Sequence, residues 1–242
     1  MLNIQTCPHS TETRCDDCRL AGICLPIGLQ LEDIGKLDQI IQRGRPVQKK
    51  EYIYHAGDKF KSVYAVRSGA VKTIKITEDG IEQITGFYLP GEIIGIDGLA
   101  TNSHINSAIT LETSAICEIP FSRLEELSTR IPHLQRRFFQ IMSKEIASEQ
   151  QLITLLGKNS AEERIAALLL SISSRNQSRG LSAKDFYLPM SRSDIANFLG
   201  LTIETVSRIF TRFHKSGLIT LDKKHIVLNH ADALRSFPQP LA

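Results

Sequence analysis

Short stretches of alternating apolar and polar residues fill the chain from about Leu25 to Pro120. They are interrupted at three pairs of turn-forming residues, Ser68-Gly69, Asp79-Gly80 and Pro90-Gly91. A period of two predicts half-buried strands, and Asp-Gly between two such runs indicates a tight β-hairpin. Several strands at this short spacing favour an antiparallel roll or barrel, which leaves few strand edges unpaired.

Apolar residues recur at steps of three and four in two further segments. Residues 29–42 predict a helix packed on the outside of the roll, and residues from Pro132 to about Leu156 predict a much longer one. Pro132 suits a first helical turn, where its missing N–H is not needed. The long helix carries a heptad seam that favours pairing with a second copy across a two-fold axis, although such a seam can also pack on its own domain. The seam residues are Phe139, Met142, Ile146, Glu149, Ile153 and Leu156.

Glu149 is the charged member of this seam. In a symmetric pair it would approach its own copy, so like charges would oppose association unless another interaction offsets them. The alternative is that Glu149 reaches solvent at the edge of the seam. The sequence therefore predicts a homodimer, and it leaves both readings of Glu149 open, repulsion in the interface or contact with solvent.

A helix-turn-helix pattern occupies Ser191–Ile219, "SRSDIANFLGLTIETVSRIFTRFHKSGLI". It follows another helical stretch that starts at about Ser160. Ser191 or Ser193 can cap the first helix of the pattern, which ends at Gly200, and Thr202 can cap the second. Two helices joined by a tight turn that contains glycine form a common DNA-reading motif.

The second helix separates apolar from polar residues at about 100° per residue. Its apolar side carries Ile203, Val206, Ile209, Phe210 and Phe213. Its polar side carries Glu204, Ser207, Arg208 and Thr211. Arginine can bond guanine with two donors, glutamate can accept from cytosine and serine can adapt, so this side suits base edges in double-stranded DNA.

The polar side could also simply face water, as in any amphipathic helix. The next segment, "GLITLDKKHIVL", argues against that reading, because it predicts a wing-like hairpin with Lys223 and Lys224 near its tip. Basic residues at such a tip suit contact with phosphates.

The charge distribution agrees with a polyanionic partner for the C-terminal third. The net charge is +3 overall, but residues 160–242 hold eleven Lys and Arg against seven Asp and Glu. The N-terminus has no basic segment followed by an apolar core, and no apolar run is long enough for a membrane span. We therefore expect a cytoplasmic protein that does not interact with a membrane.

Five cysteines are placed unevenly: Cys7, Cys15, Cys18, Cys24 and Cys117. In a reducing compartment clustered thiols are typical of metal sites or redox groups. Four thiolates suit structural zinc, although the gap between Cys18 and Cys24 is longer than usual and the fourth ligand is remote. A thiol oxidoreductase or electron carrier is the enzymatic alternative. No βαβ context, phosphate-binding loop or nucleophile elbow supports it, so we expect no enzyme.

Taken together, these features resemble the CRP/FNR superfamily of bacterial transcription regulators, over nearly the whole chain. Five stretches, in this order and spacing, resemble the FNR-type, oxygen-responsive branch: "CDDCRLAGIC", "YAVRSGAVKTIKITEDGIEQITGFYLPGE", "LETSAICEIPF", "NSAEERIAALLLSIS" and "LGLTIETVSRIFTRF". The expected fold is α+β: an antiparallel β-roll of the cyclic-nucleotide-binding type, a long dimerisation helix and a C-terminal winged helix-turn-helix. The expected division is a cysteine-rich arm at 1–28, the roll at 29–130, the dimerisation helix at 131–158 and the DNA-binding domain at 159–242.

The resemblance implies a [4Fe–4S] cluster held by Cys15, Cys18, Cys24 and Cys117. It also implies that the cluster promotes dimerisation and that oxygen destroys the cluster and inactivates the regulator. The matching DNA-reading residues are Glu204, Ser207 and Arg208, on a palindrome of the TTGAT…ATCAA kind. RNA polymerase is an implied partner, with the Thr77–Gly80 turn as one plausible surface.

Three features separate this chain from its superfamily or its branch. No arginine occurs between Arg67 and Arg123, where the nucleotide-binding branch carries its phosphate ligand, so no cyclic nucleotide is expected. Cys7 resembles a spare surface thiol rather than a ligand. Arg19 replaces a small residue often found after Cys18, where it could tune the cluster or point into water.

Overall fold

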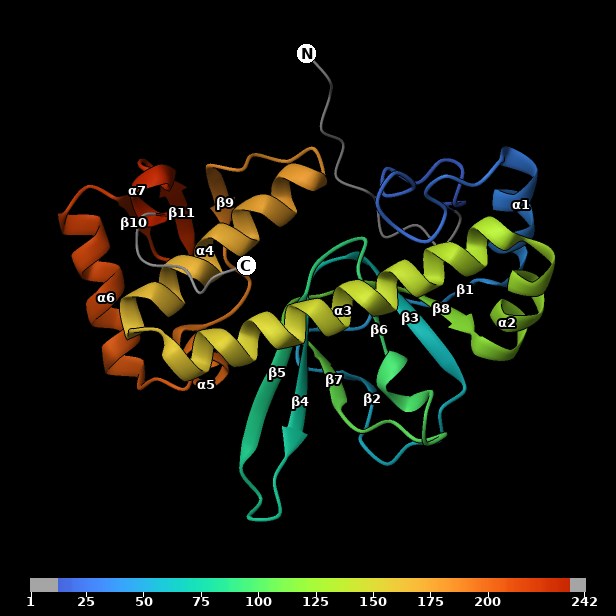
Figure 1. The fold of residues 1–242 in the computed structure, drawn as a ribbon, viewed down its shortest axis with the longest axis horizontal. Helices are drawn as coiled ribbons and strands as arrows, with labels where there is room; N and C mark the ends of the chain where they lie inside the picture. The colour runs from blue at the N-terminus through green and yellow to red at the C-terminus, as the bar shows by residue number, and fades with distance from the viewer. Residues whose placement is uncertain (1–12, 236–242) are drawn as a thin grey trace. The chain divides into compact units, whose positions relative to one another are not determined.

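The computed structural model describes residues 13–235 and divides the chain into two compact units, Met1–Ser143 and Lys144–Ala242 (Figure 1). Cys7 lies outside the described residues. The boundary falls inside the long helix α3, Pro132–Lys158, which therefore contributes its first part to one unit and its second part to the other.

Two four-stranded antiparallel sheets form the first unit, as the alternation predicted (Figure 1). One sheet has the order β1-β8-β3-β6, with bounds Gln42–Arg43, Ala115–Pro120, Ser62–Ser68 and Ile93–Ile94. The other has the order β2-β7-β4-β5, with bounds Tyr52–Tyr54, Ser107–Thr110, Val71–Ile76 and Glu82–Tyr88. The antiparallel roll expected from the sequence is therefore confirmed.

Glycines make the tight turns of the roll where a positive φ is needed. Gly80 has φ 75° in the turn that joins β4 to β5, so the Asp-Gly signal marks a real hairpin. Gly69, between β3 and β4, has φ 81°, and a Cβ atom there would collide with Ser114. Only glycine fits this close approach of two backbone segments without strain.

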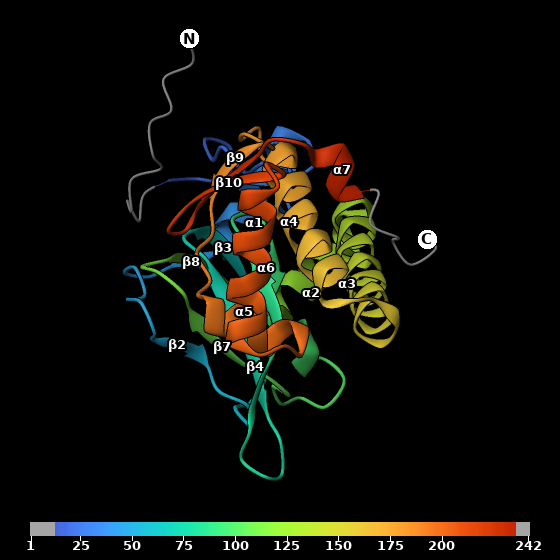
Figure 2. The same ribbon diagram turned by 90° about the vertical axis from the view of Figure 1, so that its left-hand side faces the viewer.

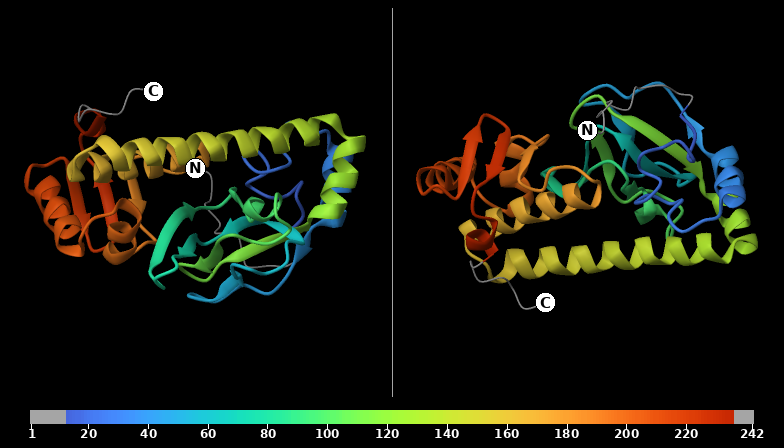
Figure 3. Two further views of the ribbon diagram at one scale, coloured as in Figure 1. Left: turned by 60° about the horizontal axis from the view of Figure 1, so that its bottom comes forward. Right: turned by 90° about the horizontal axis from the view of Figure 1, so that it is seen from above.

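Two helices cover one end of the roll and lie side by side, α1 (Leu31–Ile40) and α2 (Phe121–Arg130) (Figure 3). The sequence predicted α1 but not α2. Between them and the sheet lies the main core of this unit, which also contains Ile131, the residue between α2 and α3, and Leu134 of α3. A short 3₁₀ turn, Ile96–Gly98, follows β6.

The second unit combines α4 (Ala161–Ser178), α5 (Arg192–Leu199), α6 (Ile203–Lys215) and α7 (Ala231–Arg235) with a small sheet. That sheet has the order β10-β11-β9, with bounds Ile219–Asp222, His225–Leu228 and Asp185–Tyr187. The predicted wing hairpin is β10–β11, and β9 is an additional strand that the sequence did not indicate. The helix-turn-helix and its wing are thus both present.

Helix α3 spans 27 residues and keeps most of its seam exposed. Phe139, Ile146 and Ile153 are 57%, 57% and 70% exposed, and Glu149 is exposed as well. Exposed apolar residues repeated along one helix indicate a surface that can be covered by a partner. Within the first unit, α3 is held to the roll through Leu134 and through Phe138 and Ile141.

Candidate functional site

Local capping places the two helices of the DNA-reading motif. Ser191 forms a capping box with Asp194, its hydroxyl accepting from the Asp194 N–H at 3.0 Å. Gly200 ends α5 with φ 63°, and the Thr202 hydroxyl accepts from the Thr205 N–H at 3.1 Å at the start of α6. Helices α5 and α6 pack side by side (Figure 2). The cap at Ser191, rather than at Ser193, resolves the choice that the sequence left open.

Helix α6 buries one side and exposes the other. Val206, Ile209, Phe210 and Phe213 are at most 2% exposed. Ile203, which the sequence placed on the same side, is the first residue of α6 and is 47% exposed. Glu204, Ser207, Arg208 and Thr211 are all exposed. The four residue types suited to base edges therefore remain available to a ligand.

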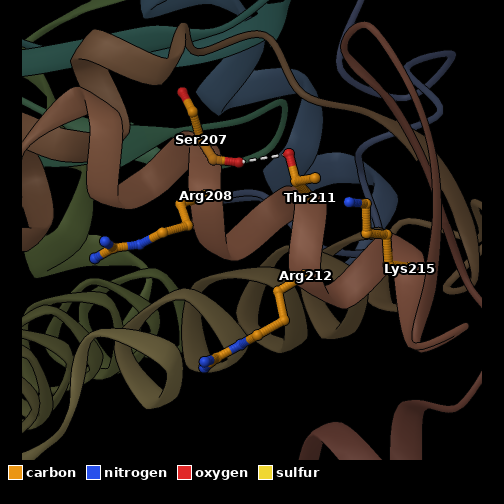
Figure 4. Close-up of a pocket in the computed structure, with 5 residues that line it drawn as sticks. All are labelled: Ser207, Arg208, Thr211, Arg212 and Lys215. Carbon is orange, nitrogen blue, oxygen red and sulfur yellow. Dashed lines mark hydrogen bonds between the residues drawn. The ribbon is translucent and has the colours of Figure 1, made fainter.

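The exposed side of α6 carries two basic residues, Arg212 and Lys215, beyond those predicted from the sequence. A pocket there is lined by Ser207, Arg208, Thr211, Arg212 and Lys215 (Figure 4). The Thr211 hydroxyl donates to the Ser207 carbonyl at 2.9 Å, and Arg208 and Arg212 extend in the same direction one turn apart. The i, i+4 spacing of the two arginines was the signal that could have found Arg212.

Two arginines fix the reading helix within the second unit. The guanidinium of Arg192, at the start of α5, lies 3.5 Å from the centre of the Phe210 ring of α6, and burial lowers the pKa of Arg192 to about 10. Arg164 donates to the carbonyls of Leu156, Asn159 and Leu199 at 2.8, 3.0 and 3.0 Å. Arg164 thereby joins the ends of α3 and α5 to the start of α4.

The wing exposes one of its two predicted lysines. Asp222 pairs with His225 at the end of the β10–β11 ladder, and Lys223 occupies the turn with φ 54° and is exposed. Lys224 instead turns back, and its Nζ donates to the Pro189 carbonyl at 2.8 Å. Of the two, Lys223 is the residue placed for contact with a phosphate.

The first unit contains the second candidate site, built around Cys117. This residue lies inside β8. It faces Arg43 of β1 on one side and Ala65 of β3 on the other, and it is 9% exposed. The sheet therefore holds Cys117 at a fixed, nearly dry position.

The three N-terminal cysteines lie in a turn-rich segment, 15–24, which we call the cysteine segment. The Cys24 N–H donates to the Leu20 carbonyl at 2.9 Å and the Ala21 N–H donates to the Cys18 carbonyl at 2.9 Å. Cys24 packs against the core cluster that contains Leu25 and Cys117. The fold thus brings the cysteine segment against the strand that carries Cys117.

Asp38 and Arg43 attach the start of the cysteine segment to the roll. The Cys15 N–H donates to Asp38 Oδ1 at 2.8 Å, and Arg43 Nη2 donates to the same oxygen and to Cys15 Sγ, the latter at 3.4 Å. Burial raises the pKa of Asp38, but its hydrogen bonds from Cys15 and Arg43 outweigh burial and hold that pKa below its usual value. No motif in the sequence indicated this attachment, which depends on the pairing of β1 with β8.

The four described cysteines form no disulfide, and a charge on one thiol raises the pKa of its neighbours. Burial raises the pKa of Cys15 and of Cys117, and it raises the pKa of Cys24 to about 12. A charge on Cys117 would raise the pKa of Cys15 and Cys24 further, and a charge on Cys18 does the same for Cys24 and Cys117. Burial and the nearby like charges therefore favour the neutral thiol at Cys15, Cys24 and Cys117.

In residues 13–235 no three His, Cys, Asp or Glu side chains are grouped tightly enough to hold a metal ion together. Arg19, next to Cys18, is exposed. Among the helices that the structure describes, none has the length and apolar character needed to cross a bilayer.

An antiparallel roll, a long helix and a winged helix-turn-helix define a DNA-binding transcription regulator. Comparison with known families agrees with this class. Residues 44–130 match the model of the cyclic nucleotide-binding domain, and residues 163–237 match the model of the Crp-like helix-turn-helix domain.

Known relatives narrow the assignment. The transcriptional activator protein Anr of Pseudomonas protegens is 51% identical over 89% of this chain and 88% of its own length. The fumarate and nitrate reduction regulatory protein of Salmonella typhimurium is 46% identical over 91% of this chain and 88% of its own length. The solved structure of FixK2 from Bradyrhizobium japonicum matches 84% of this chain and all of its own, at 30% identity and a TM-score of 0.76. The chain belongs to the CRP/FNR family of transcription regulators and is not an enzyme.

Proposed function

We propose that this chain is an oxygen-responsive regulator of anaerobic metabolism that binds DNA as a homodimer in the cytoplasm. The observation that supports this most is the meeting of the cysteine segment with Cys117, about ninety residues away in sequence, in a protein with an exposed DNA-reading helix. The relatives named above are transcriptional activators and regulators of fumarate and nitrate reduction, which fits this proposal.

The donor set of the site fits an iron–sulfur cluster. Cys15, Cys18, Cys24 and Cys117 supply four thiols without a disulfide among them, and thiolates are the ligands of [4Fe–4S] clusters. When bound, such a cluster supplies a reaction with oxygen that the side chains alone lack. Zinc would take the same four ligands, so metal analysis must distinguish the two.

The protein's own part is to keep the cysteine segment docked on the roll beside α3. Arg137 of α3 donates from Nη2 to the Ile23 carbonyl at 2.8 Å, so the cysteine segment and the helix are in direct contact. Four engaged thiolates would make that contact firmer. We propose that the seam of α3, exposed at Phe139, Ile146 and Ile153 and half-buried at Met142 and Leu156, then pairs with its copy against the repulsion of Glu149.

The dimer would present two copies of Glu204, Ser207 and Arg208 to successive major grooves. Half-sites of a TTGAT…ATCAA palindrome must then lie about 34 Å apart, one helical turn of DNA. Exposed Arg212, Lys215 and Lys223 would add phosphate contacts. The β4–β5 turn, Thr77–Gly80, is a proposed surface for RNA polymerase. We also propose that DNA binding requires no cyclic nucleotide. Micromolar binding of cAMP in titration calorimetry would overturn that second proposal.

The deciding experiment is anaerobic purification with iron and sulfide analysis and a visible spectrum, repeated after exposure to air. We expect about four irons and four sulfides per chain, an absorption lost in air, and DNA binding lost with it. Cys117→Ser should remove the absorption and the oxygen-dependent DNA binding while the fold remains. Cys7→Ser is the matched control and should retain both. Four-thiolate zinc that is stable in air would refute the oxygen-sensing proposal.

A further inference from the structure

A buried arginine without a carboxylate partner lies on the same sheet as Cys117. Arg67 of β3 is 5% exposed, and its Nη1 has no hydrogen-bond partner among the described residues. Ala65, two residues earlier on β3, pairs directly with Cys117 in the ladder. The register of β3 against β8 shifts between Val66 and Ser68, so Arg67 lies at an irregular position of the ladder, two residues from the partner of Cys117. The charge of Arg67 accordingly lowers the pKa of Cys117 against the effect of burial.

A second arginine, the half-buried Arg137 of α3, contacts the cysteine segment directly. Arg137 donates to the carbonyl of Ile23, the residue before Cys24, and its Nε is buried without a partner in the part of the chain that the structure describes. Burial lowers the pKa of Arg137. No salt bridge to a described carboxylate was found for Arg137 or for Arg67, in contrast to Arg43, which is paired with Asp38.

A buried guanidinium remains charged, and its burial is unfavourable unless an anion is close. Neutral thiols do not supply that anion. Four thiolates around a divalent centre do, because they leave a net charge of about −2 on the centre. Two guanidinium groups would balance that charge.

We propose that Arg67 and Arg137 are the counter-charges of the anionic centre that forms when Cys15, Cys18, Cys24 and Cys117 bind a metal as thiolates. The inference rests on the proposed function for its four ligands. It adds that the protein selects a doubly negative centre, and that its empty form carries an electrostatic strain which metal binding relieves. Both arginines are positioning residues, since they act through the thiolates.

The test uses full-length protein, freed of metal under a reductant and titrated with Co²⁺, whose absorption reports thiolate ligands. Arg67→Met and Arg137→Met should each weaken Co²⁺ binding about tenfold, which corresponds to ~1.4 kcal/mol. Arg67→Lys and Arg137→Lys keep the charge and should lose less. Arg137→Gln, which keeps a donor without the charge, should behave like Arg137→Met. Arg136→Met is the control, because Arg136 is the exposed neighbour on α3 and should bind as the wild type does.

Thermal unfolding of the same variants separates a counter-charge from a structural contact. Without metal, Arg67→Met should unfold at the wild-type temperature or above it, because a buried unpaired charge has been removed. With Co²⁺ the same variant should unfold below the wild type. Weaker binding together with an equally destabilised metal-free form would show a structural role and overturn the proposal.

The remaining outcomes are also distinguishable. If the wild type binds Co²⁺ through its thiols and the methionine variants bind it equally well, the counter-charge proposal fails and the proposed function stands. If the wild type shows no thiolate absorption with Co²⁺, the four-thiolate site itself is wrong, and both fail. Should Arg67→Met not fold, the Arg67→Lys and Arg137→Gln proteins decide the question.

Discussion

At the scale of single residues, Arg208 and Arg212 lie one turn apart on α6 in different surroundings. Arg208 is exposed and has no ion pair among the described residues. Two N–H donors of its guanidinium group are therefore available to bond guanine. We predict that Arg208→Ala weakens binding to the palindrome by ~1–3 kcal/mol and relaxes discrimination at one base position. Binding measured on operators substituted at each position checks this. Equal losses on every sequence would make Arg208 a phosphate contact.

Arg212 forms an ion pair with Glu162 of α4 and is the better candidate for a phosphate contact. We predict that Arg212→Ala weakens binding to all sequences alike and lowers the slope of log affinity against log salt by about 1. Titrations at several salt concentrations measure that slope. Glu162→Gln serves as the companion variant, since it frees Arg212 and should leave the slope no smaller than in the wild type.

At the scale of elements, the helix ends of the second unit depend on one side chain. Arg164 bonds three carbonyls at the ends of α3 and α5 and the start of α4. We predict that Arg164→Met lowers the free energy of unfolding of this unit by about 2–3 kcal/mol, because hydrogen bonds from a charged donor are lost at once. Urea unfolding of the metal-free protein measures it. Arg212→Met, which removes an exposed pair, should change stability by less than about 0.5 kcal/mol.

Local signals made much of the fold predictable from sequence. The Asp79-Gly80 turn, the cap at Thr202 and the end of α5 at Gly200 each depend on a few neighbouring residues, and each was predicted. Strand β9 was missed because three residues carry too short a pattern to be recognised. Helix α2 was also missed, although its apolar residues Phe121, Leu124 and Leu127 have helical spacing.

The surroundings of the thiols could not be predicted in the same way. The cysteines themselves were identified by their spacing and by family resemblance. The arginines around them were not identified. Arg43 pairs with Cys117, and Arg67 lies two residues from another partner of Cys117, only because of the register of strands far apart in sequence. A register of this kind is set by the whole hydrophobic core and not by any local motif.

At the scale of the whole molecule, the proposed homodimer depends on the seam of α3. Glu149 is exposed among apolar seam positions. We predict that Glu149→Ala tightens self-association of the metal-free protein, on the order of fivefold, because a pair of like charges is removed from the contact. Sedimentation measurements at several concentrations check this. Gln150→Ala, at the exposed neighbouring position, should have no effect, and an unchanged Glu149→Ala protein would mean that Glu149 points into water in the dimer.

The docking of the cysteine segment on the roll affects how fast the proposed metal site could bind a new metal after losing one. Joining Cys24 to Cys117 closes a loop of about ninety residues, with an entropic cost of about 4.6 kcal/mol in a flexible chain. Here folding has already closed it, through the Cys15 N–H on Asp38 and the packing of Cys24 and Leu25 in the core. In the proposed metal-bound form, the thiol of Cys117 therefore joins the other three at a high effective concentration, and the described side chains close around the metal by a local rearrangement. A regulator built this way can be reset without unfolding.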